Sequence, residues 1–281
     1  MSNFKDAKIV DCTQAEYFAI DAISRSQIVD AWRCPQKYLR NQEKPRTQTP
    51  AMLFGTLVDE LALEGKEPLS DALIVPVADC MTQKGVQSKT PKTSPAYKDA
   101  QDAALWDGKL VYLDTEADGI IANVRTCAAA VLKEWPDMDP SNGARNQVVI
   151  VATFTGTGQR VKCRVDSLGD FGVRDLKVTE DASPAGFFNK VRRFAYHIQD
   201  PFYRDLVSAL NGDDDTPFSF ACVEPDGDHI TGEYTLNPEW TDFGRDIYER
   251  TLWNMAGYKV NGWPTRYGKH ELQPKSWDLE G

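Results

Sequence analysis

The sequence lacks the features of a membrane protein or a secreted protein. No apolar run among its 281 residues is long enough to cross a bilayer. The N-terminal segment MSNFKD has none of the charged, apolar and small-residue regions of a signal peptide. We therefore expect a cytoplasmic protein that does not act on a membrane.

Paired cysteine motifs are also missing. The six cysteines are scattered, and no two of them form a Cys-x-x-Cys pair. In a reducing compartment such residues are free thiols, and Cys163 has the setting of a strand residue that faces a core. The spacing excludes the usual zinc sites and clustered iron–sulfur sites.

Basic residues are fewer than acidic residues. Lysine plus arginine is 32 and aspartate plus glutamate is 42, which gives a formal net charge of −10. This balance argues against a protein that coats nucleic acid non-specifically. It still allows an enzyme that gathers basic groups on one surface and uses acidic groups to bind metal ions.

The residue patterns predict one α/β domain over residues 1–281, with a central mixed β-sheet flanked by helices. Within it we expect four parts: a polar, weakly structured lead-in at 1–20, a mainly helical part at 21–145 with a lysine-bearing loop at 80–100, a core of strands and helices at 146–260, and a tail at 261–281. A single long helix is expected from Pro184 towards Leu210.

Two neighbouring strands carry the residues with the clearest chemistry. Strand side chains alternate between faces, so Lys162, Arg164 and Asp166 share a polar face of the first strand. Asp175 and Lys177 share a face of the next strand. If the hairpin brings Asp166 beside this pair, the two carboxylates repel one another unless a divalent cation lies between them. Mg²⁺ binds through one or two carboxylates plus substrate phosphate, and a nearby lysine can hold the attacking water or the scissile phosphate.

The pattern is therefore typical of phosphodiester hydrolysis, and the alternative is an ordinary solvated hairpin. A second pattern lies on the following helix, where Gln199 and Tyr203 are one turn apart and offer neutral donors for phosphate oxygens or nucleotide edges. Arg192 and Arg193 add positive charge nearby. The alternative there is a helix kinked at Pro201 with an aromatic core stripe.

Taken in order, these motifs resemble the PD-(D/E)xK nucleases of the RecB-like branch. Within that branch the chain is similar to the nuclease domains of the exonuclease VIII (RecE) type, over about Tyr17 to Pro264. The similarity is carried by the segments ISRS (23–26), CPQKY (34–38), AMLFGTL (51–57), KCRVD (162–166), DLKVT (175–179) and YHIQDPFY (196–203).

The resemblance implies an Mg²⁺-dependent enzyme, for which Mn²⁺ could substitute, that degrades one strand of linear duplex DNA from a 5′ end. Such enzymes assemble as homo-oligomeric rings and leave 3′ single strands for a RecT-type annealing partner, in recombination and repair systems of phage or prophage type. By the same resemblance Asp166, Asp175 and the Leu176 carbonyl are metal ligands, and Lys177 is catalytic together with both carboxylates. Gln199, Tyr203, Arg164, Arg192 and Arg193 are expected to contact DNA.

The chain departs from the family pattern in two places and lacks the C-terminal cysteines of one branch. Asp59 stands where the family has a histidine on an early helix, so we expect Asp59 to join the metal ligands. Gln147 stands where members often carry a glutamate, which removes one acidic support. No cysteine follows Cys222, so the iron–sulfur branch is excluded.

Two other functions use the same residues. One is a DNA-end-binding or assembly protein on a nuclease fold that has lost activity through Asp59. The other is an endonuclease of the same superfamily. Retention of Asp166, Asp175 and Lys177 favours an enzyme over a binding protein, because binding alone does not need all three.

Overall fold

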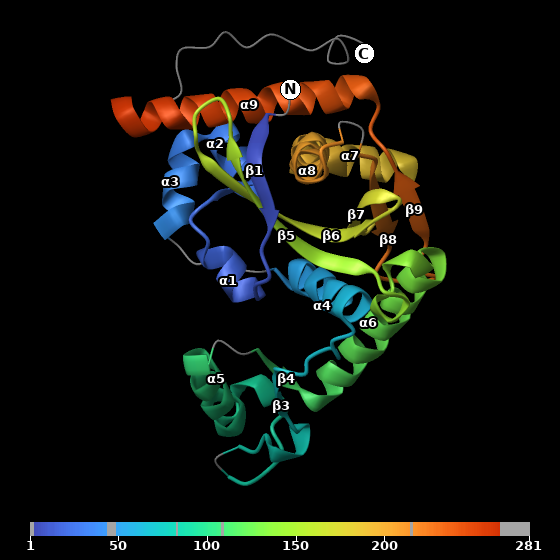
Figure 1. The fold of residues 1–281 in the computed structure, drawn as a ribbon. Coiled ribbons are helices and arrows are strands. Elements are labelled where there is room, and N and C mark those ends of the chain that lie inside the picture. Colours follow the sequence, from blue (N-terminus) through green and yellow to red (C-terminus); the bar gives the residue numbers. More distant parts are fainter. Residues whose placement is uncertain (1–2, 44–48, 83, 108–109, 214–215, 265–281) are drawn as a thin grey trace, which may run out of the picture.

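Apolar residues that alternate along the middle of the chain build the central sheet. The computed structural model describes residues 3–43, 49–82, 84–107, 110–213 and 216–264. It contains a seven-stranded mixed sheet in the order β1-β5-β6-β7-β8-β9, with β2 beside β6 (Figure 1). The strands are β1 (Phe4–Ile9), β2 (Ile23–Ser24), β5 (Arg145–Phe154), β6 (Arg160–Gly169), β7 (Gly172–Val178), β8 (Phe218–Val223) and β9 (Thr231–Tyr234). The pairs β2–β6 and β7–β8 are parallel and the others are antiparallel. The expected α/β fold with a central mixed sheet is confirmed.

Helices cover both faces of this sheet (Figure 1). Four helices pack on the face that carries Cys163: α2 (Arg25–Arg33), α7 (Pro184–Phe194), α8 (Tyr196–Asn211) and α9 (Pro238–Asn261). Two pack on the opposite face: α4 (Pro50–Glu64) and α6 (Asp114–Glu134). The helices α1 (Gln14–Ala19) and α3 (Pro35–Glu43) lie on the side of α2. Within the described part of the chain, no helix is both long and apolar enough to cross a membrane.

The predicted lead-in at 1–20 is wrong, because this segment supplies an edge strand and a helix. β1 pairs antiparallel with β5, and α1 begins at a capping box formed by Thr13 and Glu16. Only Phe4 of β1 is fully buried, where it packs on Phe154, Phe202 and Tyr248. A strand with a single apolar anchor shows no alternating pattern, so its sequence resembles a polar tail.

Residues 66–113 include more structure than the expected loop at 80–100. Here β3 (Leu73–Val75) and β4 (Val111–Leu113) form a small parallel sheet, and α5 (Pro95–Asp107) packs beside them in the lower lobe of Figure 1. Short 3₁₀ turns lie at 77–79, 91–93, 136–138 and 140–142. The small core of this lobe, made by Val75, Cys80, Tyr97 and Leu113, is too sparse to give a clear period in the sequence.

The single helix expected from Pro184 is two helices, because the chain breaks at Ala195. This residue adopts a left-handed conformation (φ 56°, ψ 43°) at the end of α7. The carbonyl groups of Phe194 and Ala195 both accept hydrogen bonds from the guanidinium of Arg25, at 2.5 and 2.7 Å. A long-range cap of this kind satisfies the last carbonyls of α7, and local sequence does not reveal it.

Pro201 lies inside α8 without ending it. Proline has no N–H for the carbonyl of His197, four residues earlier. Gly244 of α9 packs against that carbonyl so closely that a Cβ there would lie 1.6 Å from the oxygen. Only glycine permits this approach, so the proline and the glycine together set the contact between α8 and α9.

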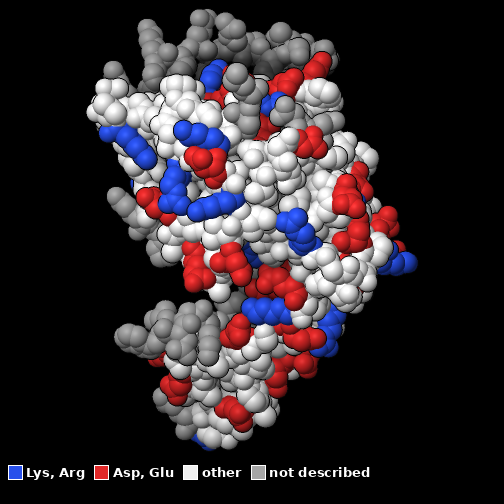
Figure 2. Space-filling view, viewed as in Figure 1, with Lys and Arg blue, Asp and Glu red and all other residues white. Residues whose placement is uncertain are grey.

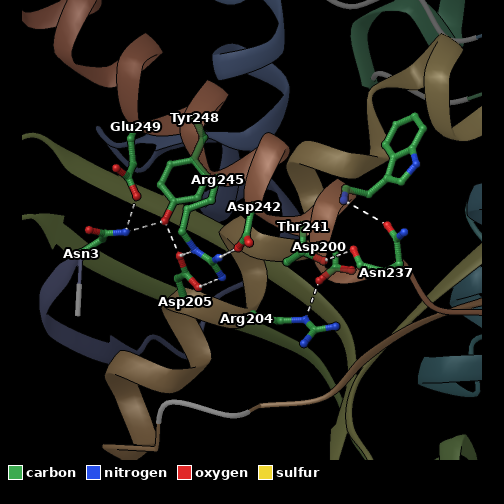
Figure 3. Close-up of polar contacts among 11 residues, drawn as sticks. Asn3, Asp200, Arg204, Asp205, Asn237, Thr241, Asp242, Arg245, Tyr248 and Glu249 are labelled. Carbon is green, nitrogen blue, oxygen red and sulfur yellow. Dashed lines mark hydrogen bonds and ion pairs between the residues drawn. The ribbon is translucent and has the colours of Figure 1, made fainter. Parts of the chain in front are cut away.

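The second half of α8 is tied to α9 and to the chain start by a polar cluster (Figure 3). Arg245 donates to both carboxylate oxygens of Asp205, at 2.9 and 3.0 Å, and Tyr248 donates to the same carboxylate. Asn3 donates to Tyr248 and Glu249, at 3.1 and 2.6 Å. We call these five residues the Asp205 cluster, in which a guanidinium fork matches the buried carboxylate.

Candidate active site

The site forms where β6 and β7 separate. Their pairing is limited to Ser167–Gly169 against Gly172–Arg174. Beyond it, the backbone N–H of Leu176 donates to the side chain of Asp166 at 2.9 Å instead of to a strand carbonyl. Asp166 lies on the face of Lys162 and Arg164, whereas Asp175 lies on the opposite face with Val173. The two carboxyl groups nevertheless come within hydrogen-bonding reach of each other, because the strands part between them.

Asp175 and Lys177 meet beneath the start of α8. The Asp175 side chain is 2% exposed and forms an ion pair with the ammonium group of Lys177. Gln199 donates from its amide to the other Asp175 oxygen at 2.5 Å. The break at Ala195 sets the start of α8, so it also sets Gln199 over Asp175. The predicted association of Asp166, Asp175 and Lys177 is therefore present in the structure.

Charge repulsion marks this cluster. Burial and the nearby Asp175 carboxylate raise the pKa of Asp166 to about 7. Burial, followed by the Asp166 carboxylate, raises the pKa of Asp59 well above its ordinary value. Burial alone would lower the pKa of Lys177, but Asp175 and other neighbours outweigh it and the pKa lies above the ordinary value. Asp166 and Asp175 thus share one charged lysine, and Asp59 interacts electrostatically with these groups and with Arg164.

A cleft of about 620 Å³ opens onto Asp166. Asp59 of α4 lines it, together with Arg164 of β6, Tyr203 of α8 and residues of α1, α2 and α3. Lys162 fixes one wall, because its ammonium group donates to the carbonyls of Tyr17 and Ile20 at the end of α1, both at 2.8 Å. Figure 2 shows acidic side chains gathered where the main body meets the lower lobe. A phosphate-bearing ligand therefore needs either a cation or local basic groups to approach the cleft.

Gln147 lies opposite Asp166, where the β5–β6 pairing is interrupted without a change of register. The pairing passes from Asn146–Ser167 to Val148–Val165, and Gln147 takes a left-handed backbone conformation (φ 53°). Its side-chain oxygen accepts a hydrogen bond from Arg164, which also binds Glu64 at 3.1 Å. Gln147 lines the cleft from this position. The position aligned with the family glutamate thus faces the site.

The predicted DNA-contact residues divide into two groups. Arg164 and Tyr203 line the cleft. Gln199 is 5% exposed and is bonded to Asp175, so it holds a carboxylate where the sequence predicted an open donor for DNA. Arg192 and Arg193 are exposed on α7 and do not line the cleft. The structure therefore does not bring these two arginines into the site.

The donor set around the gap suits a hard divalent cation. Asp166, Asp175 and the Leu176 carbonyl offer oxygen atoms, and the buried Asp175 oxygen that faces Lys177 accepts no hydrogen bond from any other described group. Within the described ranges, no three Asp, Glu, His or Cys side chains come together as a preformed metal site, so Asp59 does not complete a trio with the other two. Mg²⁺ needs only one or two protein carboxylates, so these residues fit it.

Two neighbours of Lys177 had no role in the sequence prediction. The Tyr196 ring lies 5.2 Å from the Lys177 ammonium group, and the Arg25 guanidinium lies 5.5 Å from the same ring. Both residues fall within motifs that carry the family resemblance, yet their proximity depends on the capping contact at Ala195. Spacing in the sequence could not have placed them beside Lys177.

Comparisons with known proteins agree with this geometry. A family model described as a PDDEXK-like domain of unknown function (DUF3799) matches residues 24–273. The crystal structure of "Putative exonuclease" from Eubacterium rectale matches with a TM-score of 0.59 and 16% sequence identity, covering 94% of this chain and 97% of the other. At that identity the match shows a shared fold. No curated protein matches the sequence.

Proposed function

The chain belongs to the DUF3799 family of PDDEXK-like domains, and from that premise we propose that it is a metal-dependent nuclease that hydrolyses DNA. In finer detail we propose an exonuclease of the exonuclease VIII type. It would degrade one strand of linear duplex DNA from the 5′ end and leave 3′ single strands for an annealing partner in recombination.

One observation carries the proposal. Asp166 and Asp175 approach each other in the gap between β6 and β7, and Lys177 lies beside Asp175. Such a cluster costs stability in a protein that has no use for it. A carboxyl group whose pKa is raised by burial and by a second carboxylate, at the edge of a cleft, is characteristic of a functional site.

The residues divide the work as follows. Asp166, Asp175 and the Leu176 carbonyl would hold the cation, which when bound supplies charge neutralisation and an acidic water. Lys177 carries a full positive charge near the same point and can hold a phosphate oxygen. Gln199 orients Asp175, and Tyr203 can donate to a nucleotide in the cleft.

Digestion of linear duplex DNA tests the proposal. Duplexes labelled at either the 5′ or the 3′ end are incubated with the protein and Mg²⁺ or Mn²⁺. We expect early release of short 5′-labelled products while the 3′ label stays on long strands. A closed circular duplex of the same sequence should resist digestion.

The controls separate the alternatives. Cutting of the closed circle would identify an endonuclease. Binding to duplex ends without any product in either metal would support the end-binding alternative and reject the enzyme. Release of the 3′ label first would reject the proposed polarity while keeping the nuclease. Ring assembly is checked by sedimentation of the full chain with and without DNA ends.

A further inference from the structure

A line of aromatic side chains leads from Lys177 to the protein surface. The ammonium group of Lys177 lies 5.2 Å from the ring centre of Tyr196. Tyr196 stacks on Phe194 at the end of α7, with ring centres 5.7 Å apart. Phe194 is 41% exposed. The surface beside the site is therefore connected to the catalytic lysine by two stacked rings.

Arginine side chains accompany these rings. The Arg193 guanidinium lies 5.4 Å from the Phe194 ring, and the Arg33 guanidinium lies 5.9 Å from the Trp32 ring. Arg33 also donates to the backbone carbonyl of Arg193 at 2.5 Å, which joins α2 to α7. Neither arginine forms an ion pair with a described residue, so both charges remain available to an anion.

The line continues across α2 to α9. The ring of Trp32, 40% exposed, lies 6.0 Å from the buried ring of His197. Phe243, 51% exposed, stacks on the same His197 ring, with ring centres 5.5 Å apart. We call the whole line the aromatic–cation track, made by Tyr196, Phe194, Arg193, Arg33, Trp32 and Phe243.

We propose that the aromatic–cation track binds a single-stranded segment of DNA that is continuous with the strand in the active site. Aromatic faces stack on bases, and arginines between them bind phosphates. Bases in a duplex are covered by their neighbours, so ring stacking of this kind requires unpaired bases. The inference rests on the proposed nuclease function and adds the form of the substrate near the site.

Two features of the track favour nucleic acid over a protein partner. Its exposed rings alternate with the guanidinium groups of Arg193 and Arg33, and a single strand presents bases and phosphates in the same alternation. It also begins at a lysine assigned to phosphate chemistry, so a bound strand needs no separate path to the site. A second copy of this chain is the competing occupant, and the test includes it.

Binding of a fluorescent thymidine 20-mer, followed by anisotropy in EDTA to prevent cleavage, tests the proposal. We expect the double variant Trp32→Ala/Phe194→Ala to bind about tenfold more weakly or worse, since each base stack contributes severalfold. Arg193→Glu should weaken binding and reduce its salt dependence. Phe194→Tyr keeps a stacking ring and should retain wild-type affinity.

Matched controls lie on the far part of α9. Trp253 is 55% exposed, and the Arg250 side chain is 65% exposed, so each offers a comparable residue off the track. Trp253→Ala and Arg250→Glu should leave the affinity within about twofold. Thermal unfolding of every variant confirms that it is folded.

Unchanged affinity in the double variant overturns the proposal, as does an equal loss of affinity for a blunt duplex. Conversion of an oligomer to a monomer with unchanged affinity for the 20-mer would assign the track to contacts between copies. Mg²⁺-dependent digestion is measured in parallel. If the wild type digests DNA and the variants bind the 20-mer as the wild type does, the track proposal is rejected and the nuclease proposal stands. If the variants lose binding but the wild type does not digest DNA, the nuclease proposal is rejected and the track proposal stands.

Discussion

The two halves of α8 hold buried carboxylates in opposite ways. The second half carries Asp205, whose oxygens are matched by the Arg245 fork and the Tyr248 hydroxyl. The first half lies over Asp175, which approaches Asp166 across the strand gap and shares one lysine with it. In the Asp205 cluster a cation and a hydroxyl group match the carboxylate, whereas the Asp166–Asp175 pair has more negative than positive charge. The difference separates a carboxylate kept for stability from one kept for ligand binding.

The largest expected effect is on catalysis. Asp175→Asn and Lys177→Ala should each reduce Mg²⁺-dependent degradation of linear duplex DNA by about 100-fold or more, because a charge aimed at the reacting phosphate is lost. Initial rates with labelled duplex measure the change, and circular dichroism checks the fold. Activity near that of the wild type in either folded variant would contradict the assignment of Asp175 and Lys177 to catalysis.

The next effect is a pH dependence of stability. In the folded metal-free protein the pKa of Asp166 is about 7, against an ordinary value of 3.8 for aspartate. The folded state then binds more protons between these limits, so the free energy of unfolding falls as pH rises from about 4 to 7, by at most about 4 kcal/mol. Urea titrations in EDTA measure this slope.

Asp166→Asn provides the matched control for that slope. It keeps an acceptor for the Leu176 N–H but cannot ionise, so its slope between pH 4 and 7 should be flatter. Mg²⁺ at pH 8 should raise the unfolding temperature of the wild type more than that of the variant. Identical pH profiles of the unfolding free energy for both proteins would show that ionisation of Asp166 does not destabilise the fold.

A smaller effect is expected in the Asp205 cluster. Arg245→Ala leaves a buried carboxylate without its fork and should reduce the free energy of unfolding by about 2–3 kcal/mol, below the cost of a fully buried pair because the arginine side chain is 31% exposed. Activity per folded molecule should not change. Arg250→Ala, which breaks an exposed pair one turn further on, should cost no more than about 0.5 kcal/mol.

Sequence patterns predicted which strands carry the site, but they did not predict how those strands are arranged. Alternation placed Val161, Cys163 and Val165 in the core and Lys162, Arg164 and Asp166 opposite, as observed. It also suggested a simple hairpin with Asp166 beside Asp175 on one face. The strands instead separate beyond the Ser167–Arg174 pair, at the Asp166 end, and the carboxyl groups meet from opposite faces. Strand separation depends on contacts distant in sequence, so no local pattern reveals it.

Other elements escaped prediction for related physical reasons. The strand at Phe4–Ile9 has one buried residue, and the end of α7 depends on Arg25, far away in the chain. Gln199 and Tyr203 were correctly placed on one helix face, but only the fold shows that Gln199 binds Asp175. Residues 265–281 of the expected tail lie outside the described residues. The sequence therefore predicts the chemistry of single strands and helices, but it does not predict the contacts between distant segments.

The cation-binding claim is tested most directly by calorimetric titration of Mn²⁺ into metal-free protein at pH 8. We predict saturable binding by the wild type and by Arg245→Ala, and loss of that binding in both Asp166→Asn and Asp175→Asn. Equal binding by the wild type and the two aspartate variants would contradict the assignment of the strand gap as the metal site.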